Sequence, residues 1–444
     1  DCRLIEFVFS TDQSYIIEMS EYRFRLLDSA GAPLTYNLST VAAWIDVAAL
    51  TAWTTSGAPT YTANTSYVKN TVDSVVYGYK CIQTHISAGG KEPGVSTDWD
   101  DWWELVSDYS GGDVVKTGSA STLKYYVCKN AHNASDASEP SIGADWQDYW
   151  YYMDEADGSA ATAWPVVVTH PYLEAELWDV DYAQKNDVIK MTHQLHDIAE
   201  LRRYDGNVWA YVPGIITGAP WEEMNEDPNK KIDPSSDAAA ADPPVADSIT
   251  YNATENIFNE SHVGRYLMLH DFESDSGEQG YAYITSYVNP KRVLGYNVLK
   301  LGGAGKTSRW AFNAFYTNNY PANITFHEAR TVLAGTPKNP DKLWFSKSFI
   351  YNDFNTGDSD DDGFDLTANT AQSNKIIWIS SANALATGTF GAEFSSKSPS
   401  DKALNKTNKN ATEQSAWGSE WIRPVKIGSM LYYVQRTGRK LREF

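Results

Sequence analysis

The sequence predicts an all-β fold, in which a β-propeller-like host domain carries small inserted β modules. Aromatic residues make up 13% of the 444 residues and charged residues only 21%, a balance that favours β-sheets over helical bundles. Apolar runs are short, and clusters of Gly, Asn and Ser separate them. This rhythm is typical of blades or barrels and not of βαβ units.

Each predicted strand follows from a local pattern. The clearest are residues 324–326 and 331–334, two apolar runs that a Pro/Gly/Asn turn separates from residues 343–345. Alternating apolar residues between positions 7 and 26 predict three antiparallel strands near the N-terminus. Further strands are predicted at 177–182, 188–191, 208–211, 263–269, 281–288, 293–299, 376–379 and 430–434.

Length, charge and cysteine content limit the function. The chain is long enough for two to four domains, and its formal net charge of −21 argues against a protein that binds phosphate backbones. Its three cysteines, Cys2, Cys81 and Cys128, form no CxxC pair, which predicts synthesis in a reducing cytoplasm. No run approaches the ~18 apolar residues of a membrane span. Both ends look cut, so we expect a fragment of a longer chain.

An internal repeat with a period of 47 residues is the strongest local signal. Its matched pairs are Val68 and Val115, Tyr79 and Tyr126, Cys81 and Cys128, His85 and His132, Glu92-Pro93 and Glu139-Pro140, Asp98-Trp99 and Asp145-Trp146, and Trp103 and Trp150. Tandem copies at one spacing indicate a duplication. We expect each copy to be a β-hairpin module whose aromatic side chains supply much of its packing, because the module is too small for a large core.

These copies resemble the small chitin-binding modules appended to chitinases, in which an aromatic strand, a Glu-Pro turn and a terminal Trp recur. The resemblance covers residues 61–153 and implies that sugar faces stack on exposed rings. An alternative is that Trp99 and Trp146 only form the module core. Trp102 and Tyr149 differ between the copies, which favours a surface position. The candidate carbohydrate-binding residues are Trp99, Trp102, Trp103, Trp146, Tyr149 and Trp150.

The paired His85 and His132 could be metal ligands. A lone histidine in each module, with no second ligand close in sequence, favours a structural role instead. Cys81 and Cys128 occupy equivalent places in separate modules, so we expect each to be a buried small apolar residue. We therefore expect no metal and no cofactor.

Two further motifs match known ligand sites only in part. Residues 302–307, GGAGKT, resemble the end of a phosphate loop, but Lys300 stands where that loop requires its first glycine. Residues 358–363 match the first half of a calcium loop, but Asn369 stands where a bidentate glutamate is required. Neither motif predicts a site.

A catalytic constellation is not evident. His193, His196 and Asp197 suggest a metal site, but the run before them has a strand pattern, which favours a structural role. The chain contains no HExxH motif, nucleophile elbow or Ser-His-Asp order, and sequence alone cannot place two carboxylates as a glycosidase pair. We therefore expect that the protein is not an enzyme.

Five stretches, in one order, resemble the tail tubular protein B, or tail nozzle, family of short-tailed bacteriophages. They are residues 7–19, 188–203, 324–354, 358–394 and 422–444. Residues 218–229 and 262–271 resemble the small β insert that many of these proteins carry. The chain departs from the family where Thr331 follows Arg330 in place of the usual leucine, and in its tandem modules, which nozzle proteins generally lack.

The nozzle resemblance implies a homo-hexameric ring of propeller-like subunits in the virion tail. Such a ring would contact the tail adaptor ring and the tail fibres, and double-stranded DNA would pass through its channel. An acidic wall would let DNA slide, because it does not hold phosphates. Candidate wall residues are Asp358, Asp360, Asp361 and Asp362, for which a solvated acidic turn is the alternative. The modules would lie outside and contact host-surface glycans, where repetition around the ring strengthens weak binding.

The predicted organisation alternates host segments and inserts. The host comprises residues 1–60, 154–217 and 311–444, the modules are 61–106 and 107–153, and a linker with a small β-barrel or sandwich occupies 218–310. Two other functions are possible from the sequence. One is a secreted polysaccharide-binding or polysaccharide-degrading protein, which needs a carboxylate pair in a cleft, and the other is a phage receptor-binding tail protein.

Overall fold

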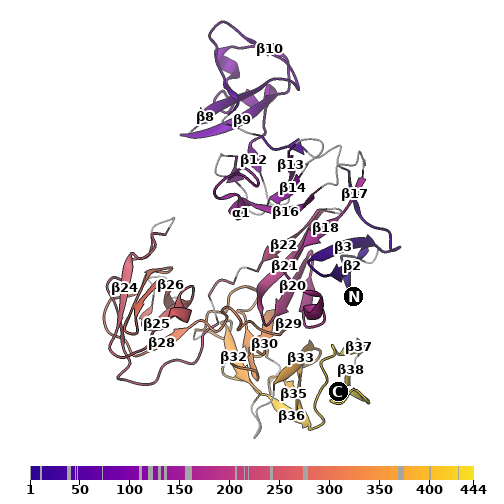
Figure 1. Ribbon diagram of the computed structural model, residues 1–444, viewed down its shortest axis with the longest axis vertical. Coiled ribbons are helices and arrows are strands. Elements are labelled where there is room, and N and C mark those ends of the chain that lie inside the picture. The colour runs from indigo at the N-terminus through magenta and orange to yellow at the C-terminus, as the bar shows by residue number, and fades with distance from the viewer. Residues whose placement is uncertain are drawn as a thin grey trace. The chain divides into compact units, whose positions relative to one another are not determined.

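The computed structural model consists almost entirely of β-strands and turns, which confirms the all-β prediction (Figure 1). Its described residues contain one α-helix, α1 (Trp146–Tyr149). Within the described residues we find no helix with the length and apolar character of a membrane span. The description covers the chain except residues 1, 11–12, 38–41, 46, 48, 73, 110–112, 119–123, 129–131, 135–137, 156–162, 206–207, 215, 219, 241–243, 274–278, 358, 369–374, 400–401 and 429.

The chain forms two compact units. Unit 1 comprises Asp1–Trp178, Gln184–Ile189 and Glu200–Val212. Unit 2 comprises Asp179–Ala183, Lys190–Ala199 and Pro213–Phe444. The predicted host segment 154–217 is therefore divided between the two units.

A four-stranded antiparallel sheet opens unit 1 and confirms the three strands predicted near the N-terminus. Its order is β1 (Arg3–Val8), β2 (Ser14–Ser20), β3 (Arg23–Asp28) and β18 (Val167–Thr169). Alternate residues of the first three strands are buried, as their apolar alternation requires. Phe7 and Tyr15 pack their rings edge-on against Trp209, at centroid distances of 4.8 and 5.5 Å. The short strands β4 (Thr35–Asn37) and β17 (Ala163–Pro165) pair beside this sheet.

The next sheet has strands in chain order: β19 (Asp181–Lys185), β20 (Val188–His193), β21 (His196–Asp205) and β22 (Val208–Pro213). The strands predicted at 188–191 and 208–211 are confirmed. The strand predicted at 177–182 is wrong for its first half, because residues 174–179 form a 3-10 turn followed by a further turn. Leu177 is buried from that turn, so its apolar character reflects packing and not strand alternation.

Unit 2 contains two more sheets of four antiparallel strands in chain order. One is β29 (Asn323–His327), β30 (Arg330–Ala334), β31 (Lys342–Phe345) and β32 (Phe364–Thr367). The other is β33 (Ile376–Ser381), β34 (Leu385–Thr389), β35 (Glu393–Ser396) and β36 (Thr412–Ser415). The strands predicted at 324–326, 331–334, 343–345 and 376–379 all lie within these elements.

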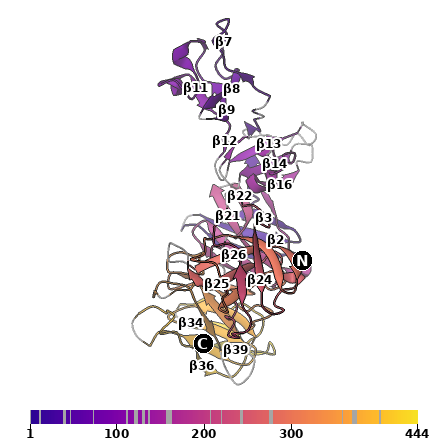
Figure 2. The same cartoon turned by 90° about the vertical axis from the view of Figure 1, so that its left-hand side faces the viewer.

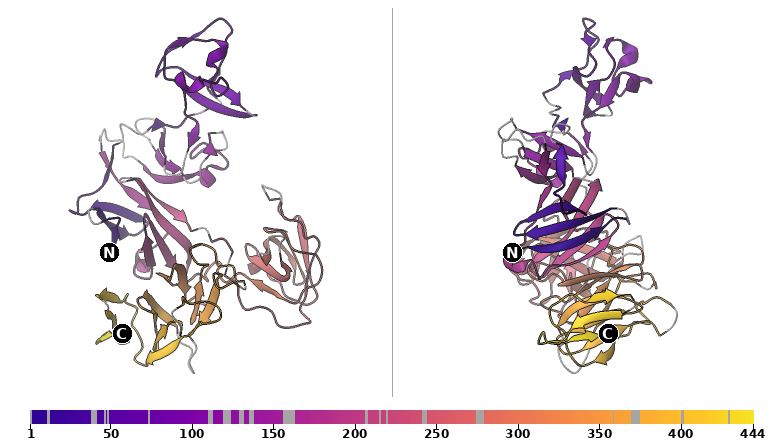
Figure 3. Two further views of the ribbon diagram at one scale, coloured as in Figure 1. Left: turned by 180° about the vertical axis from the view of Figure 1, so that it is seen from behind. Right: turned by 90° about the vertical axis from the view of Figure 1, so that its right-hand side faces the viewer.

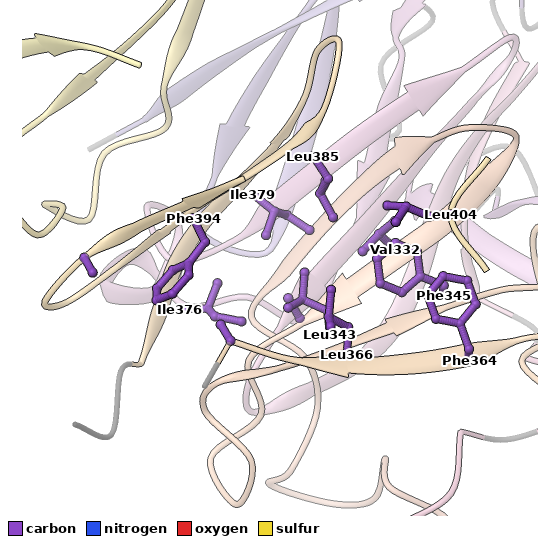
Figure 4. Close-up of a cluster of buried hydrophobic side chains, with 13 residues drawn as sticks. Val332, Leu343, Phe345, Phe364, Leu366, Ile376, Ile379, Leu385, Phe394 and Leu404 are labelled. Atoms are coloured by element: carbon purple, nitrogen blue, oxygen red, sulfur yellow. The ribbon is translucent and has the colours of Figure 1, made fainter. Parts of the chain in front are cut away.

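One hydrophobic core joins these two sheets. Figure 4 shows side chains from both sheets pointing toward one another; among them are Val332, Leu343, Phe345, Phe364, Leu366, Ile376, Ile379, Leu385 and Phe394. The rings of Phe345 and Phe364 stack at 4.4 Å with an interplanar angle of 11°. Sheets of four consecutive antiparallel strands have the form of propeller blades, whereas closure into a propeller remains a prediction.

A three-stranded sheet follows at the end of unit 2: β37 (Val425–Ile427), β38 (Met430–Val434) and β39 (Leu441–Glu443). Leu431 and Tyr433 are buried on one face and pack against Trp378 and Ala386. The cross-strand register places Val425, Ile427, Met430 and Leu441 on the opposite face. The exposed side chains of these four residues make that face mainly apolar, with the exposed Glu443 at its edge.

The predicted insert forms a six-stranded sheet with its own core. Its order is β23 (Ile232–Pro234), β24 (Ile249–Ala253), β27 (Arg292–Asn297), β26 (Gln279–Asn289), β25 (Tyr266–Glu273) and β28 (Trp310–Phe312). Figure 3 shows it as a body of its own within unit 2. Buried Tyr251, Leu267, Ile284 and Val293 fill its core. The GGAGKT run lies in the irregular segment before β28, where Thr307 exchanges backbone hydrogen bonds with Ile232, so no helix follows it.

Candidate carbohydrate-binding modules

The two copies of the repeat fold as two small β modules (Figure 2). Module 1 contains β7 (Thr60–Tyr61), β8 (Tyr67–Val72), β9 (Val75–Cys81), β10 (His85–Ile86) and β11 (Trp103–Leu105). Module 2 contains β12 (Asp108–Tyr109), β13 (Val114–Thr117), β14 (Lys124–Cys128), β15 (His132–Asn133), α1 and β16 (Trp150–Glu155). In both, an antiparallel hairpin pairs with the strand that starts at the terminal Trp.

The module boundaries differ from the predicted start at residue 61. β5 (Ala42–Ala43) adds a parallel edge strand to β13 of module 2, and β6 (Thr51–Ala52) adds the equivalent strand to β8 of module 1. Module 1 is therefore inserted between the first strand of module 2 and the rest of that module. The reason is physical: each hairpin leaves one edge unpaired, and a short flanking segment covers it.

Equivalent aromatic contacts hold the two modules. In module 1, Trp103 packs edge-on against Tyr61 at 5.0 Å and against His85 at 5.1 Å. In module 2, Trp150 makes the same contacts with Tyr109 at 5.0 Å and with His132 at 5.1 Å. The pairs formed by Tyr79 with Trp99 and by Tyr126 with Trp146 also match, at 5.5 and 5.7 Å. The duplication read from the sequence is thus a duplication of one packing arrangement.

Cys81 and Cys128 are both buried, as predicted. Each thiol lies 3.7 Å from Nδ1 of the histidine four residues later, His85 or His132. Nδ1 of His85 is also 2.7 Å from the carbonyl oxygen of Gln83, so in the neutral ring this nitrogen carries the proton and donates it. Burial raises the pKa of the Cys81 thiol, which keeps it protonated and apolar. Cys81 and His85 therefore pack against each other inside module 1. This contact agrees with the structural role expected for His85.

Two of the six candidate ligand residues are core residues, which corrects the prediction. Trp103 and Trp150 are each only 1% exposed. Their indole N–H groups donate to the carbonyl oxygens of Lys91 at 2.8 Å and Ser138 at 2.9 Å, which hold equivalent places in the repeat. A sugar cannot reach these rings unless the module unfolds, because a core this small needs its largest side chains inside.

The other four candidates are half-buried at the edge of each core. Trp99 and Trp146 contact Tyr79 and Tyr126 through ring edges and keep part of their surface open to solvent. The Lys91 ammonium lies 3.6 Å from the ring centroid of Trp102, so this cation already occupies one face of that ring.

Tyr149 lies 4.4 Å from the ring of His132 and is also half-buried. Trp102 and Tyr149 are also equivalent positions, but only Trp99 and Trp146 keep both the residue type and the edge contact with a tyrosine in the two modules. They remain the strongest candidates for sugar stacking.

Trp44 and Trp53 were missed by the sequence reasoning. Trp44 follows β5 and stacks on Tyr109 at 5.4 Å with an interplanar angle of 18°, and Trp53 follows β6 and packs on the core of module 1. Two Ala-Trp dipeptides nine residues apart, at 43–44 and 52–53, are the signal that could have revealed them. Strands of two residues show no periodicity, so this signal has to be read from the aromatic residue alone.

Three of the predicted channel-wall residues, Asp360, Asp361 and Asp362, lie in a loop built around Arg330. This side chain is 2% exposed and donates to the carbonyl oxygens of Asp360 at 2.7 Å, Asp361 at 3.1 Å and Asp362 at 2.8 Å. Burial lowers the pKa of the Arg330 guanidinium, although the nearby carboxylates oppose this effect. The Asp360 and Asp361 carboxylates are exposed, whereas Asp362 accepts a hydrogen bond from the Ser359 amide. Asp358 and Asn369 lie outside the described residues.

His193 and His196 stand at the ends of the tight turn between β20 and β21. Their ring centroids are 5.0 Å apart, and the amide of Leu195 donates to Nδ1 of His193 at 3.2 Å. The strand predicted directly before His193 is confirmed, whereas the structural role of the two histidines stays a prediction.

Comparison with known proteins identifies no family. No protein-family model matches the chain. No curated protein matches it either.

Proposed function

We propose that this chain is a subunit of a tail nozzle ring of a short-tailed bacteriophage, and that its two modules bind host-surface glycans. The observation that carries the proposal is the position of two nozzle-like stretches. Residues 324–354 include most of β29 and all of β30 and β31, and residues 358–394 include β32, β33, β34 and the first half of β35. These strands form two adjacent blade-like sheets with one core, the local architecture that a propeller subunit requires.

The exposed face of the β37–β39 sheet supports assembly into a ring. Val425 is 59% exposed, Ile427 64% and Leu441 69%, and a contiguous apolar surface of this kind marks an interaction site. We propose that a second copy of this chain covers it. Charge favours this occupant: residues 422–444 carry six basic residues and one acidic residue, whereas the whole chain has a net charge of −21.

The acidic balance of the chain supports a channel that releases DNA. The exposed carboxylates of Asp360 and Asp361 stand on a loop whose backbone is fixed by Arg330. Carboxylates held in place repel phosphates and do not bind them, so DNA would slide past such a wall. Asp360, Asp361 and Asp362 remain proposed wall residues on this basis, and Asp358 is proposed from the sequence alone.

The modules support a second role at the host surface. Trp99 and Trp146 are half-exposed rings in equivalent positions of two linked modules. Two weak sites on one chain, repeated around a ring, bind a polymeric glycan more tightly than either site alone. The rest of the proposed setting is the virion tail, with the adaptor ring and tail fibres as neighbours and synthesis in the host cytoplasm.

Light scattering on the purified chain, alone and mixed with its adaptor ring, tests the assembly. The proposal predicts a mass of six chains, at least when the adaptor is present. A monomer under both conditions that still binds insoluble chitin would favour the alternative of a secreted polysaccharide-binding protein. A monomer without glycan binding would contradict both roles.

A further inference from the structure

A cavity of about 720 Å³ lies within unit 2, where the inserted sheet meets the segments that connect it to the neighbouring sheets. This volume falls in the range of roughly 300–1,000 Å³ that small-molecule sites have. Four tyrosines line it: Tyr266 and Tyr283 from β25 and β26, and Tyr316 and Tyr320 from the segment after β28. All four are half-buried, so each keeps part of its surface open.

The cavity has little free positive charge. Arg265 also lines it, but its Nη2 donates to Glu222 at 3.0 Å and to the carbonyl oxygen of Asn313 at 2.6 Å. The guanidinium carbon lies 3.9 Å from the ring centroid of Tyr316, so Arg265 holds this tyrosine in place. Because the Arg265 guanidinium is already paired with Glu222 and stacked on Tyr316, it is not available to bind a phosphate group.

Polar groups stand among the tyrosines. The Asp197 carboxylate accepts a hydrogen bond from the amide of Ile198 at 2.8 Å and lines the cavity together with Thr317 and Asn318. Burial raises the pKa of Asp197 and of Tyr320, which agrees with a recess that is partly withdrawn from water. Such a recess combines aromatic surface with a few hydrogen-bonding groups.

We propose that this cavity binds a short neutral oligosaccharide. A sugar ring has apolar C–H faces that suit tyrosine rings, and hydroxyl groups that can donate to Asp197 and accept from tyrosine hydroxyls. The paired state of Arg265 disfavours an anionic ligand, and the single carboxylate, Asp197, disfavours a polycation. This site is separate from the modules and does not depend on ring assembly.

Isothermal titration of the full chain tests the site, in a Trp99→Ala, Trp146→Ala background that removes stacking by the modules. The probes are the trimers of N-acetylglucosamine, glucose and galactose. We expect at least one trimer to bind. Asp197→Asn and Tyr283→Ala should each weaken that binding about tenfold or more, because each removes a hydrogen bond or a stacking surface.

Tyr296→Ala is the matched control. Tyr296 lies 5.5 Å from Tyr283 but does not line the cavity, so its replacement should change the affinity less than about threefold. Circular dichroism shows whether each variant is folded. If Tyr283→Ala does not fold, Asp197→Asn still tests the site, because asparagine has nearly the same shape as aspartate. The proposal is overturned if no trimer binds in this background, or if both cavity variants bind as well as Tyr296→Ala. Binding of the Trp99→Ala, Trp146→Ala variant to chitin tests the modules independently of the cavity, because this variant should no longer bind chitin through them.

Discussion

At the residue scale, the structure separates side chains that hold the fold from side chains that can meet a ligand. Arg330 is the clearest example of the first kind. Its guanidinium donates to four carbonyl oxygens, three in the acidic loop and one at Ser346, and it also lies 5.3 Å from the ring of Phe364. An arginine fits this position because its planar fork offers several donors at fixed angles.

Replacement of Arg330 tests this role. Arg330→Met should lower the free energy of unfolding by about 3 kcal/mol, because buried carbonyl groups lose their donors. Arg330→Lys should recover only part of this loss. Chemical denaturation measures both, and Arg439→Met at an exposed turn is the control, with an expected change within about 0.5 kcal/mol. Equal effects at positions 330 and 439 would contradict the structural role.

The tryptophans of one module should divide into two functional classes. Trp103→Ala should destabilise module 1 by about 3–5 kcal/mol, because it empties the centre of a small core. Trp99→Ala should cost less stability and should lower retention on chitin beads. Thermal unfolding and a bead assay measure the two effects. If Trp103→Ala lowered retention while module 1 stayed folded, Trp103 would have to contact the sugar.

At the scale of single elements, the inserted sheet contains a histidine that should make its stability depend on pH. His262 stacks on Phe312 at 4.1 Å, and its Nδ1 accepts from the Asn259 amide. Burial, together with the positive charges of Arg265 and Lys338, lowers the pKa of His262 to about 4, and Glu222 opposes part of this shift. The unfolded chain therefore binds a proton at His262 at a higher pH than the folded chain.

The sign of the effect follows from this difference. The stability that His262 contributes is complete above about pH 6.5, the usual histidine pKa, and is lost as the pH falls toward 4. His262→Phe keeps the stacking and should flatten this dependence. Unfolding midpoints between pH 4 and 7 measure it. A slope in His262→Phe as steep as in the natural chain would show that other groups cause the dependence.

The outer face of the β37–β39 sheet should govern association. Ile427→Lys places a charge in the proposed contact between copies and should reduce the assembled fraction by at least about tenfold. The side chain is exposed in the single chain, so its folding should be unchanged. Sedimentation measures both the mass and the monomer shape. Lys291→Glu, at an exposed turn of the inserted sheet, controls for a general effect of charge.

At the scale of the whole molecule, the sequence predicted many of the longer strands and the duplicated modules, because both leave a signal along the chain. Apolar runs bounded by turn residues located the strands from β29 to β31, and the period of 47 aligned residues that make equivalent contacts. The two-residue strands β5 and β6 could not be predicted, because their pairing depends on an edge left open far along the chain.

The same distinction applies to the candidate sites. The sequence predicted all six module aromatics as candidate carbohydrate-binding residues, but Trp103 and Trp150 are core residues. Their burial depends on packing in three dimensions, which a local sequence pattern does not show. The tyrosine cavity brings Asp197 together with residues more than sixty positions away. No local pattern can reveal such a site, because its residues meet only after the chain folds.

Electron microscopy of the purified full-length chain, with and without its adaptor ring, is the most direct test of assembly into a nozzle ring. We expect class averages with six-fold symmetry, a central opening, and additional density from the modules at the outer edge. Particles that show no rotational symmetry, even beside the adaptor ring, would contradict a nozzle subunit.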